Sequence, residues 1–179
     1  MLKIDNTALV IVDVQGKLAQ MMSDKETLFA NLERMVKGAR ILGLPIVWAE
    51  QNPTKLGATI TEVSQHLADI KPVSKMSFSC AGCEDFNQAL QDTQCNQVLV
   101  VGIEAHICVY QTATGLVDAG YDVEVVTDAV SSRFAHNKDV GLKKMKSRGV
   151  ALTSTEMALF ELMETAEHPD FRAIQQVVK

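Results

Sequence analysis

Short apolar runs alternate with segments of helical periodicity along the chain, and this alternation limits the possible folds more than any other feature. Several runs are continuously apolar, as in strands that are covered on both faces. Helices that connect successive strands favour parallel pairing through right-handed crossovers. The six expected strands cover residues 7–14, 44–49, 72–75, 97–102, 121–126 and 150–153. We therefore predict an α/β fold: a single doubly wound, three-layer α/β/α domain with a six-stranded, mostly parallel sheet of Rossmann-like order 3-2-1-4-5-6.

The segments between these runs carry signals for helix starts and helix ends. Ser23 with Glu26 and Thr59 with Glu62 have the capping-box spacing, and each pair precedes an apolar stripe. Glycine follows several stripes, at the position where helices commonly end. The other expected helices lie near residues 86–90 and over 105–119, 137–148, 155–164 and 169–178. We expect these helices to cover both faces of the sheet.

Composition and charge restrict the class of partner. Hydrophobic residues make up 47% of the 179 residues and charged residues 22%, as in ordinary globular proteins. The net charge of −5 argues against nucleic acid or an anionic membrane as the main partner. No apolar run is long enough to span a bilayer, and the amino terminus lacks a signal-peptide pattern. We expect a cytoplasmic protein with a small-molecule substrate and with no nucleic-acid or membrane partner.

Residues 98–109 (VLVVGIEAHICV) join a buried strand, a glycine and a cysteine. The apolar run ends in Gly102, and Cys108 follows near the start of an expected helix. In an α/β fold this is the carboxyl end of a strand, where ligands commonly bind. A thiol in the first turns of a helix lies at the positive end of the helix dipole, which favours the thiolate. The alternative is that Cys108 is a small, buried core residue.

Two charged residues are expected at the same edge of the sheet as Cys108. Asp13 ends the first expected strand, and Lys75 ends the third. The topological switch lies between strands one and four, which brings Asp13 and Cys108 toward one crevice. A carboxylate that can take a thiol proton, a cation that favours both anions, and a thiol form a workable nucleophilic site. A structural carboxylate at Asp13 and a surface lysine at Lys75 are the alternatives.

Several motifs in this order resemble the isochorismatase-like cysteine hydrolases, a family that includes isochorismatases, nicotinamidases and carbamoyl-amide hydrolases. The loop at residues 50–53 and the tail at 168–169 are most similar to the isochorismatase domain-containing proteins of that family. The resemblance covers nearly the whole chain and implies a single isochorismatase-like hydrolase domain over residues 1–179. The motifs are residues 8–15 (ALVIVDVQ), 75–79 (KMSFS), 102–109 (GIEAHICV), 118–123 (DAGYDV) and 128–133 (DAVSSR).

The resemblance implies a catalytic triad of Asp13, Lys75 and Cys108. It also implies a cis peptide bond between Ile103 and Glu104, which would aim the backbone N–H groups of Glu104 and Cys108 at a developing oxyanion. The implied reaction is hydrolysis of a small amide or carbamoyl-type C–N bond, through a thioester on the cysteine. Family members are commonly oligomeric, so the resemblance implies a homo-oligomer. No cofactor is expected.

Departures from the family pattern restrict the reaction. Nicotinamidases of this family carry an Asp-x-His metal motif after the second strand, where this chain has residues 49–57 (AEQNPTKLG) and no histidine. We therefore expect no metal site and no metal-dependent nicotinamidase activity. The cysteine favours acyl chemistry, and cleavage of an enol ether, as by isochorismatases, is the alternative reaction. A non-enzymatic binding or scaffold member of the family is the alternative to an enzyme.

Five side chains near the expected site are candidates for a substrate pocket. They are Gln15, Trp48, Gln51, Phe78 and His106. Core packing is the alternative for the two aromatic residues. For His106 the alternative is a packed or surface histidine.

Cys80 and Cys83 have the C-x-x-C spacing, which we interpret as chance. A redox pair would need to open a helix beside a βαβ unit, and a zinc site would need a second ligand pair. If the two cysteines did form a redox pair, the protein would be a thiol oxidoreductase, and this remains a further alternative function. With Cys95 and Cys108 the chain has four cysteines, which are expected to be free thiols in a cytosolic protein. The chain has no glycine-rich phosphate loop, which argues against a nucleotide-binding domain.

Overall fold

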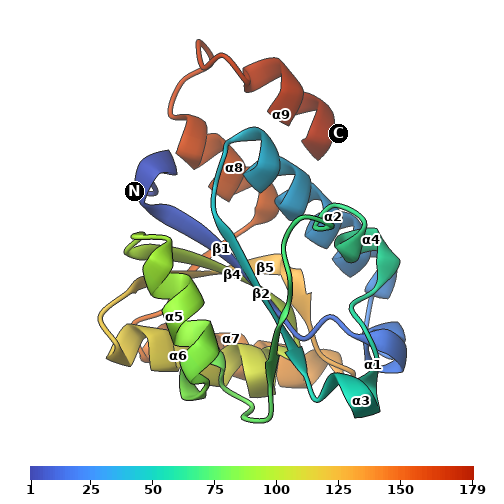
Figure 1. Cartoon of the computed structure of the whole chain (residues 1–179). Helices are drawn as coiled ribbons and strands as arrows, with labels where there is room; N and C mark the ends of the chain where they lie inside the picture. The colour runs from blue at the N-terminus through green and yellow to red at the C-terminus, as the bar shows by residue number, and fades with distance from the viewer.

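The computed structural model describes residues 1–179 and has one six-stranded sheet at its centre (Figure 1). The strand order is β3-β2-β1-β4-β5-β6, and every neighbouring pair is parallel. The predicted strand order is confirmed, and the sheet is parallel throughout rather than mostly parallel. The strands are β1 (Thr7–Val12), β2 (Ile46–Gln51), β3 (Val73–Lys75), β4 (Gln97–Ile103), β5 (Asp122–Ser131) and β6 (Ala151–Thr153).

Helices cover both faces of the sheet, as predicted, and each face has its own hydrophobic core (Figure 1). One face packs against α2 (Lys25–Ile41), α4 (Thr61–Ser64), α8 (Thr155–Met163) and α9 (Phe171–Val178). The other packs against α5 (Glu84–Asp92), α6 (Tyr110–Asp118) and α7 (Ala135–Ser147). The shorter pieces are η1 (Ile4–Asn6), α1 (Gly16–Gln20), α3 (Pro53–Leu56), η2 (Cys80–Gly82) and the π-helical turn η3 (Ala105–Val109). None of the helices combines the length and the apolar character needed to cross a membrane.

The central strands β1 and β4 lie in register and end side by side. Every residue of β1 is buried, because helices cover both of its faces. Val12 of β1 is paired with Gly102 of β4. Gly102 has a φ of +122°, and a Cβ there would lie 2.1 Å from the Val12 carbonyl oxygen. Only glycine fits this close approach, which sets where β4 turns toward Cys108.

Strand ends differ from the sequence prediction in two places that matter for the site. The first strand stops at Val12 because Asp13 adopts a left-handed conformation, with a φ of 52°. The fifth strand continues to Ser131 rather than ending at residue 126. It is longer because a register shift in the β4–β5 pairing lets its last residues pair with the end of β4. Both differences lie at the carboxyl edge of the sheet.

The two predicted capping boxes do not form. The hydroxyl of Ser23 forms a hydrogen bond with Ser131 Oγ (3.2 Å), and α2 begins two residues after Ser23. The hydroxyl of Thr59 donates to Glu50 Oε1 (2.8 Å), and α4 begins two residues after Thr59. In each case a side chain from a strand, Ser131 of β5 or Glu50 of β2, replaces the local capping partner. Both hydroxyls therefore hold loops to the carboxyl edge of the sheet.

Candidate active site

The carboxyl ends of three strands bring Asp13, Lys75 and Cys108 together. Asp13 directly follows β1, Lys75 is the last residue of β3, and Cys108 lies in η3, the turn after β4. Their relative exposures are 1% for Asp13, 3% for Lys75 and 8% for Cys108, so all three are buried. Nζ of Lys75 is 2.7 Å from Oδ2 of Asp13, and Asp13 and Cys108 line the same cavity. The structure thus places the three residues of the expected triad at one site.

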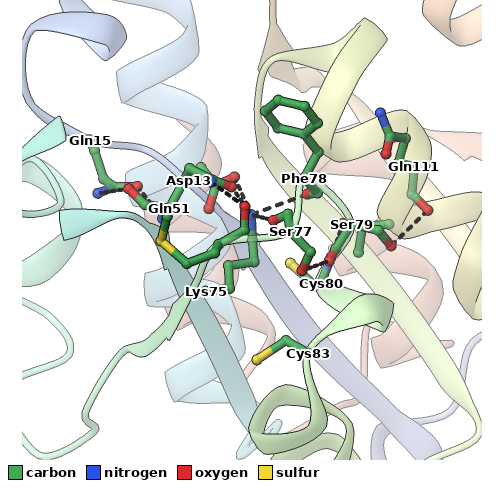
Figure 2. A network of polar contacts seen from close by, with 12 residues as sticks. Asp13, Gln15, Gln51, Lys75, Ser77, Phe78, Ser79, Cys80, Cys83 and Gln111 are labelled. Carbon is green, nitrogen blue, oxygen red and sulfur yellow. Dashed lines mark hydrogen bonds and ion pairs between the residues drawn. The ribbon is translucent and has the colours of Figure 1, made fainter. Parts of the chain in front are cut away.

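Asp13 is held in place by the backbone around it. Its left-handed conformation is one that aspartate tolerates better than most residues. Its N–H donates to the Ala49 carbonyl (3.2 Å), and its carbonyl accepts from the N–H of Gln15 (2.8 Å). Figure 2 shows the carboxylate beside Lys75. Burial raises the pKa of the Asp13 carboxyl, and the charge and hydrogen bond of Lys75 act against this rise.

The ammonium group of Lys75 is enclosed by acceptors (Figure 2). Its side chain has no exposed surface. Besides Asp13, Nζ lies 2.9 Å from Gln51 Oε1 and 3.1 Å from the main-chain oxygens of both Ser77 and Phe78. A buried ion pair is costly unless further hydrogen bonds satisfy both partners. These four acceptors meet that requirement for Lys75.

One oxygen of Asp13 is left without a hydrogen bond. Asp13 Oδ1 and Trp48 Nε1 are the two buried side-chain polar atoms that have no partner in the protein. Leaving a buried acceptor unsatisfied costs about 1–3 kcal/mol. Asp13 also lines the cavity that contains Cys108. Its free oxygen is therefore available to a proton of the thiol or of a bound molecule.

Cys108 is a buried thiol in the π-helical turn between β4 and α6. The turn packs directly on α7, where a Cβ on Gly141 would lie 2.9 Å from the Ala105 carbonyl oxygen. Burial raises the pKa of the Cys108 thiol, and the neighbouring charge of Asp13 raises it further. The direction of this shift is opposite to the one expected from the position of Cys108 at a helix start. The resting group is a neutral thiol.

A cavity of about 120 Å³ gives access to Asp13 and Cys108. Its wall is mostly apolar, and no lysine or arginine is among the lining residues. Pockets for drug-sized ligands are several times larger. The lining residues are Asp13, Leu18, Gln51, Leu56, Phe78, Ile103, Glu104, Ile107 and Cys108. The site therefore fits a small molecule with little charge.

Two of the five pocket candidates, Gln51 and Phe78, line this cavity, and three do not. The side chain of Gln15 is buried against the backbone of Gln51: Oε1 accepts from its N–H (2.6 Å) and Nε2 donates to its carbonyl (3.1 Å). Trp48 packs in the core on the α2 face. His106 Nδ1 is 3.0 Å from the hydroxyl of Ser132. The structure therefore brings Gln51 and Phe78 to the cavity with Cys108 but places Gln15, Trp48 and His106 outside its wall.

The sequence analysis missed the apolar wall of the cavity. Leu18 of α1 and Leu56 of α3 are leucines in short helical turns, and Ile107 lies in η3 next to Cys108. A turn of four or five residues is too short to have a buried stripe of its own. An apolar side chain in such a turn, close to a strand end, is the signal that could have indicated a pocket wall.

The peptide bond between Ile103 and Glu104 is cis, as the resemblance implied. The Glu104 carboxylate is buried and accepts hydrogen bonds from the backbone N–H (2.9 Å) and Nε (3.1 Å) of Arg133. These bonds fasten the segment after β5 to the turn that carries Cys108. The backbone N–H of Glu104 has no acceptor within the protein. It is therefore free to donate to a bound molecule.

The other three cysteines lie outside the cavity wall, and all four cysteines are free thiols. Cys80 of η2 is fully buried, and burial raises the pKa of its thiol to about 12. Cys95 is also buried, whereas Cys83 is partly exposed. No group of three or more His, Cys, Asp or Glu side chains is arranged to hold a metal ion.

Comparison with known proteins agrees with this fold. The model of the isochorismatase domain matches residues 7–157. The secreted isochorismatase effector Isc1 of Phytophthora sojae (strain P6497) is 35% identical over 178 residues, which cover 97% of this chain and 85% of that protein. Isochorismatase domain-containing protein 2 of Danio rerio is 33% identical, with 96% and 86% covered.

Among solved structures, the MAR1 ribonuclease from Caenorhabditis elegans superimposes with a TM-score of 0.92. It is 34% identical, and the alignment covers 99% of this chain and 91% of that one. Domain match, sequence identity and superposition all extend over most of the chain. The chain therefore belongs to the isochorismatase family.

Proposed function

We propose that this isochorismatase-family hydrolase cleaves the C–N bond of a small, uncharged amide or carbamoyl compound through a thioester on Cys108. The unpartnered Oδ1 of Asp13 is the observation that carries the proposal. It is a buried proton acceptor in the same cavity as the only cysteine that lines that cavity. A base next to a thiol is the arrangement that nucleophilic acyl transfer requires.

In the first step the sulfur of Cys108 attacks the carbonyl carbon while Asp13 takes the thiol proton. The tetrahedral intermediate collapses when its C–N bond breaks, and Asp13 returns the proton to the leaving nitrogen. In the second half a water molecule gives a proton to Asp13 and attacks the thioester. The C–S bond breaks, the acid is released, and the sulfur regains the proton.

The electrostatics support proton transfer during attack rather than before it. Burial raises the pKa of both the Cys108 thiol and the Asp13 carboxyl. A thiolate would add a second negative charge beside Asp13 in a site with little solvent. We assign binding of the carbonyl oxygen, as it takes up negative charge in the transition state, to the backbone N–H groups of Glu104 and Cys108. The N–H of Glu104 has no acceptor in the protein, which supports this assignment.

The cavity supports a small neutral substrate over the alternatives. An isochorismate-type enol ether carries carboxylates, and the lining offers two carboxylates, Asp13 and Glu104, and no accessible cation. The ammonium of Lys75 already faces four acceptors. The relative from C. elegans is named a ribonuclease, but a nucleotide is much larger than a volume of about 120 Å³.

The test uses propionamide and butyramide as probes. We expect the unmodified protein to release ammonia and to show an acyl adduct on Cys108 by intact mass after acid quenching. Cys108→Ala should lower ammonia release by at least roughly a thousandfold and give no adduct. Cys95→Ala removes a buried thiol outside the cavity and is the matched control.

Full activity of Cys108→Ala would overturn the proposed mechanism. So would an unmodified protein that gives no adduct and whose Cys108 is alkylated no faster than Cys95. The second result would favour the binding or scaffold alternative, in which the site holds a molecule without reacting with it.

A further inference from the structure

Gln51 links the cavity to the buried ion pair (Figure 2). It is the last residue of β2, and Oε1 of its side chain accepts a hydrogen bond from Nζ of Lys75 (2.9 Å). Its Nε2 donates to the carbonyl of Met76 (2.8 Å). The carbonyl cannot donate and the ammonium cannot accept, so the Gln51 amide has only one orientation that satisfies both neighbours.

The backbone of Gln51 is fixed as firmly as its side chain. The buried side chain of Gln15 accepts from the N–H of Gln51 (2.6 Å) and donates to its carbonyl (3.1 Å). Nε2 of Gln15 also donates to the carbonyl of Gly57 (2.7 Å), which follows Leu56 of the cavity wall. Gln51 is therefore a rigid support on one side of the Lys75 ammonium.

The position of this ammonium decides which oxygen of Asp13 is free. Lys75 has three protons and four acceptors, and only Asp13 among the four carries a charge. The three neutral acceptors hold the ammonium against the pull of the carboxylate, and with fewer of them it would be drawn toward both carboxylate oxygens. In the structure it lies on Oδ2, and Oδ1 has no partner.

We propose that Gln51 is a positioning residue that holds the Lys75 ammonium on Oδ2 of Asp13, so that Oδ1 stays free for the reacting proton. The inference rests on the proposed function, in which Asp13 is the base, and it adds how that base is kept free. Gln51 acts through Lys75 and takes no proton itself.

Four titratable groups surround the Asp13 carboxylate. Lys75 of β3 is in direct contact, and Cys108 of η3 and Glu104 line the same cavity. Cys80 of η2 interacts electrostatically with Asp13 and Cys108. Only Lys75 is cationic, and its charge stabilises the ionised form of Asp13 more than the interactions with Cys108 and with the Gln51 backbone do. A change at the Gln51 contact of Lys75 therefore bears on the largest of these stabilising interactions.

The test measures the rate at which iodoacetamide alkylates Cys108 against pH, by mass spectrometry on the full chain. Gln51→Glu keeps the shape but adds a carboxylate, which disfavours the ionised form of Asp13. We expect the acid limb of its profile to move up by about one pH unit. Gln51→Leu removes one of the three neutral acceptors that compete with Asp13 for the ammonium, which allows the ammonium to shift toward Oδ1. We expect the plateau of its alkylation rate to fall roughly tenfold. The acid limb of the rate–pH profile should lie at the same pH or at a lower one.

Gln111→Leu is the matched control, because Gln111 lies near the site and its side chain forms no hydrogen bond within the protein (Figure 2). We expect its profile to match that of the unmodified protein. Asp13→Asn should abolish the acid limb, and if it does not, the proposed function itself fails. If Asp13→Asn abolishes the limb but both Gln51 variants keep the original profile, only the positioning role is overturned. A purely structural role would lower thermal stability in both variants without moving the limb.

Discussion

Two clefts open at the carboxyl edge of this sheet, and they differ in size and in what their polar groups contact. The larger, of about 470 Å³, lies beside the end of β5 and the starts of α2 and α7. Its Ser23 and Ser131 hydroxyls bond to each other, and Asp128 Oδ1 accepts from the N–H and hydroxyl of Thr155. The smaller, of about 120 Å³, contains Cys108 and one buried acceptor, Asp13 Oδ1, that nothing satisfies.

The comparison shows that volume alone does not locate the chemistry. In the larger cleft these polar groups serve the fold by bonding to one another. In the smaller cleft most of the lining side chains are apolar. Lys75 binds Oδ2 of Asp13 and leaves Oδ1 without a hydrogen bond. Native proteins leave few buried polar groups unpaired. Trp48 Nε1 is also unpaired but lies in the core, whereas Asp13 Oδ1 belongs to a residue that lines a cavity with a thiol, where an unpaired acceptor can serve a function at a cost in stability.

Breaking the ion pair of the smaller cleft should have the largest effect on stability. Lys75→Met leaves the Asp13 carboxylate buried with no counter-ion. We expect the free energy of unfolding, measured in urea, to fall by about 3–5 kcal/mol. In Lys75→Met with Asp13→Asn, neither charge is present, and asparagine tolerates the left-handed backbone at this position. We expect the double variant to lie within about 2 kcal/mol of the unmodified protein.

The pH dependence of Lys75→Met sharpens this test. Burial already raises the pKa of Asp13 in the folded protein, and removing Lys75 raises it further. A raised carboxyl pKa favours the folded state at low pH and loses that contribution as the carboxyl ionises. The loss of stability should therefore be greatest near about pH 8 and shrink toward about pH 5. A loss that grows as the pH falls would contradict the buried-charge explanation.

The sequence was sufficient to predict the sheet, because its signals are local or follow from topology. Continuously apolar strands joined by helices predicted a parallel, doubly wound sheet, and the order that is common in such sheets is the one observed. The ends of the first and third strands predicted where Asp13 and Lys75 lie. Gly102, at the end of the fourth expected strand, meets the close approach of Val12 that allows β4 to turn toward Cys108.

The misses come from long-range partners and from solvation, which the local sequence does not encode. Ser23 and Thr59 look like helix caps, but their hydroxyls bind Ser131, which is 108 residues away, and Glu50, which is nine residues away on the preceding strand. Gln15 is adjacent to the site in sequence but is used to hold the backbone of Gln51. The thiol of Cys108 has the position of an activated thiolate, but its burial in the folded chain and the neighbouring charge of Asp13 raise its pKa instead of lowering it.

A substitution at Cys80 tests how far water is excluded from the region around the ion pair, and its expected effect is smaller. Burial raises the pKa of its thiol from 9.0 to about 12. Unfolding in alkali lets the thiol ionise, so this contribution to stability is complete below about pH 9 and decreases as the pH rises. Above about pH 9, the free energy of unfolding should fall with pH less steeply in Cys80→Ala than in the unmodified protein. We expect the two slopes to differ by about 1 kcal/mol per pH unit. Urea denaturation of both proteins, with Cys95→Ala as the control, measures this difference. Equal slopes would mean that water reaches Cys80.

Lys138 in the larger cleft should give the smallest effect. It is half-buried among Asp24, Asp128 and Asp139, with no direct ion pair, and burial lowers the pKa of its ammonium despite the attraction of these carboxylates. Because attraction and desolvation oppose each other, we expect Lys138→Met to change the free energy of unfolding by no more than about 0.5 kcal/mol. It should leave the alkylation rate of Cys108 unchanged, since its cleft shares no lining residue with the smaller one. A tenfold slower alkylation would show that the two clefts act together, and the distinction between a structural and a reactive cleft would fail.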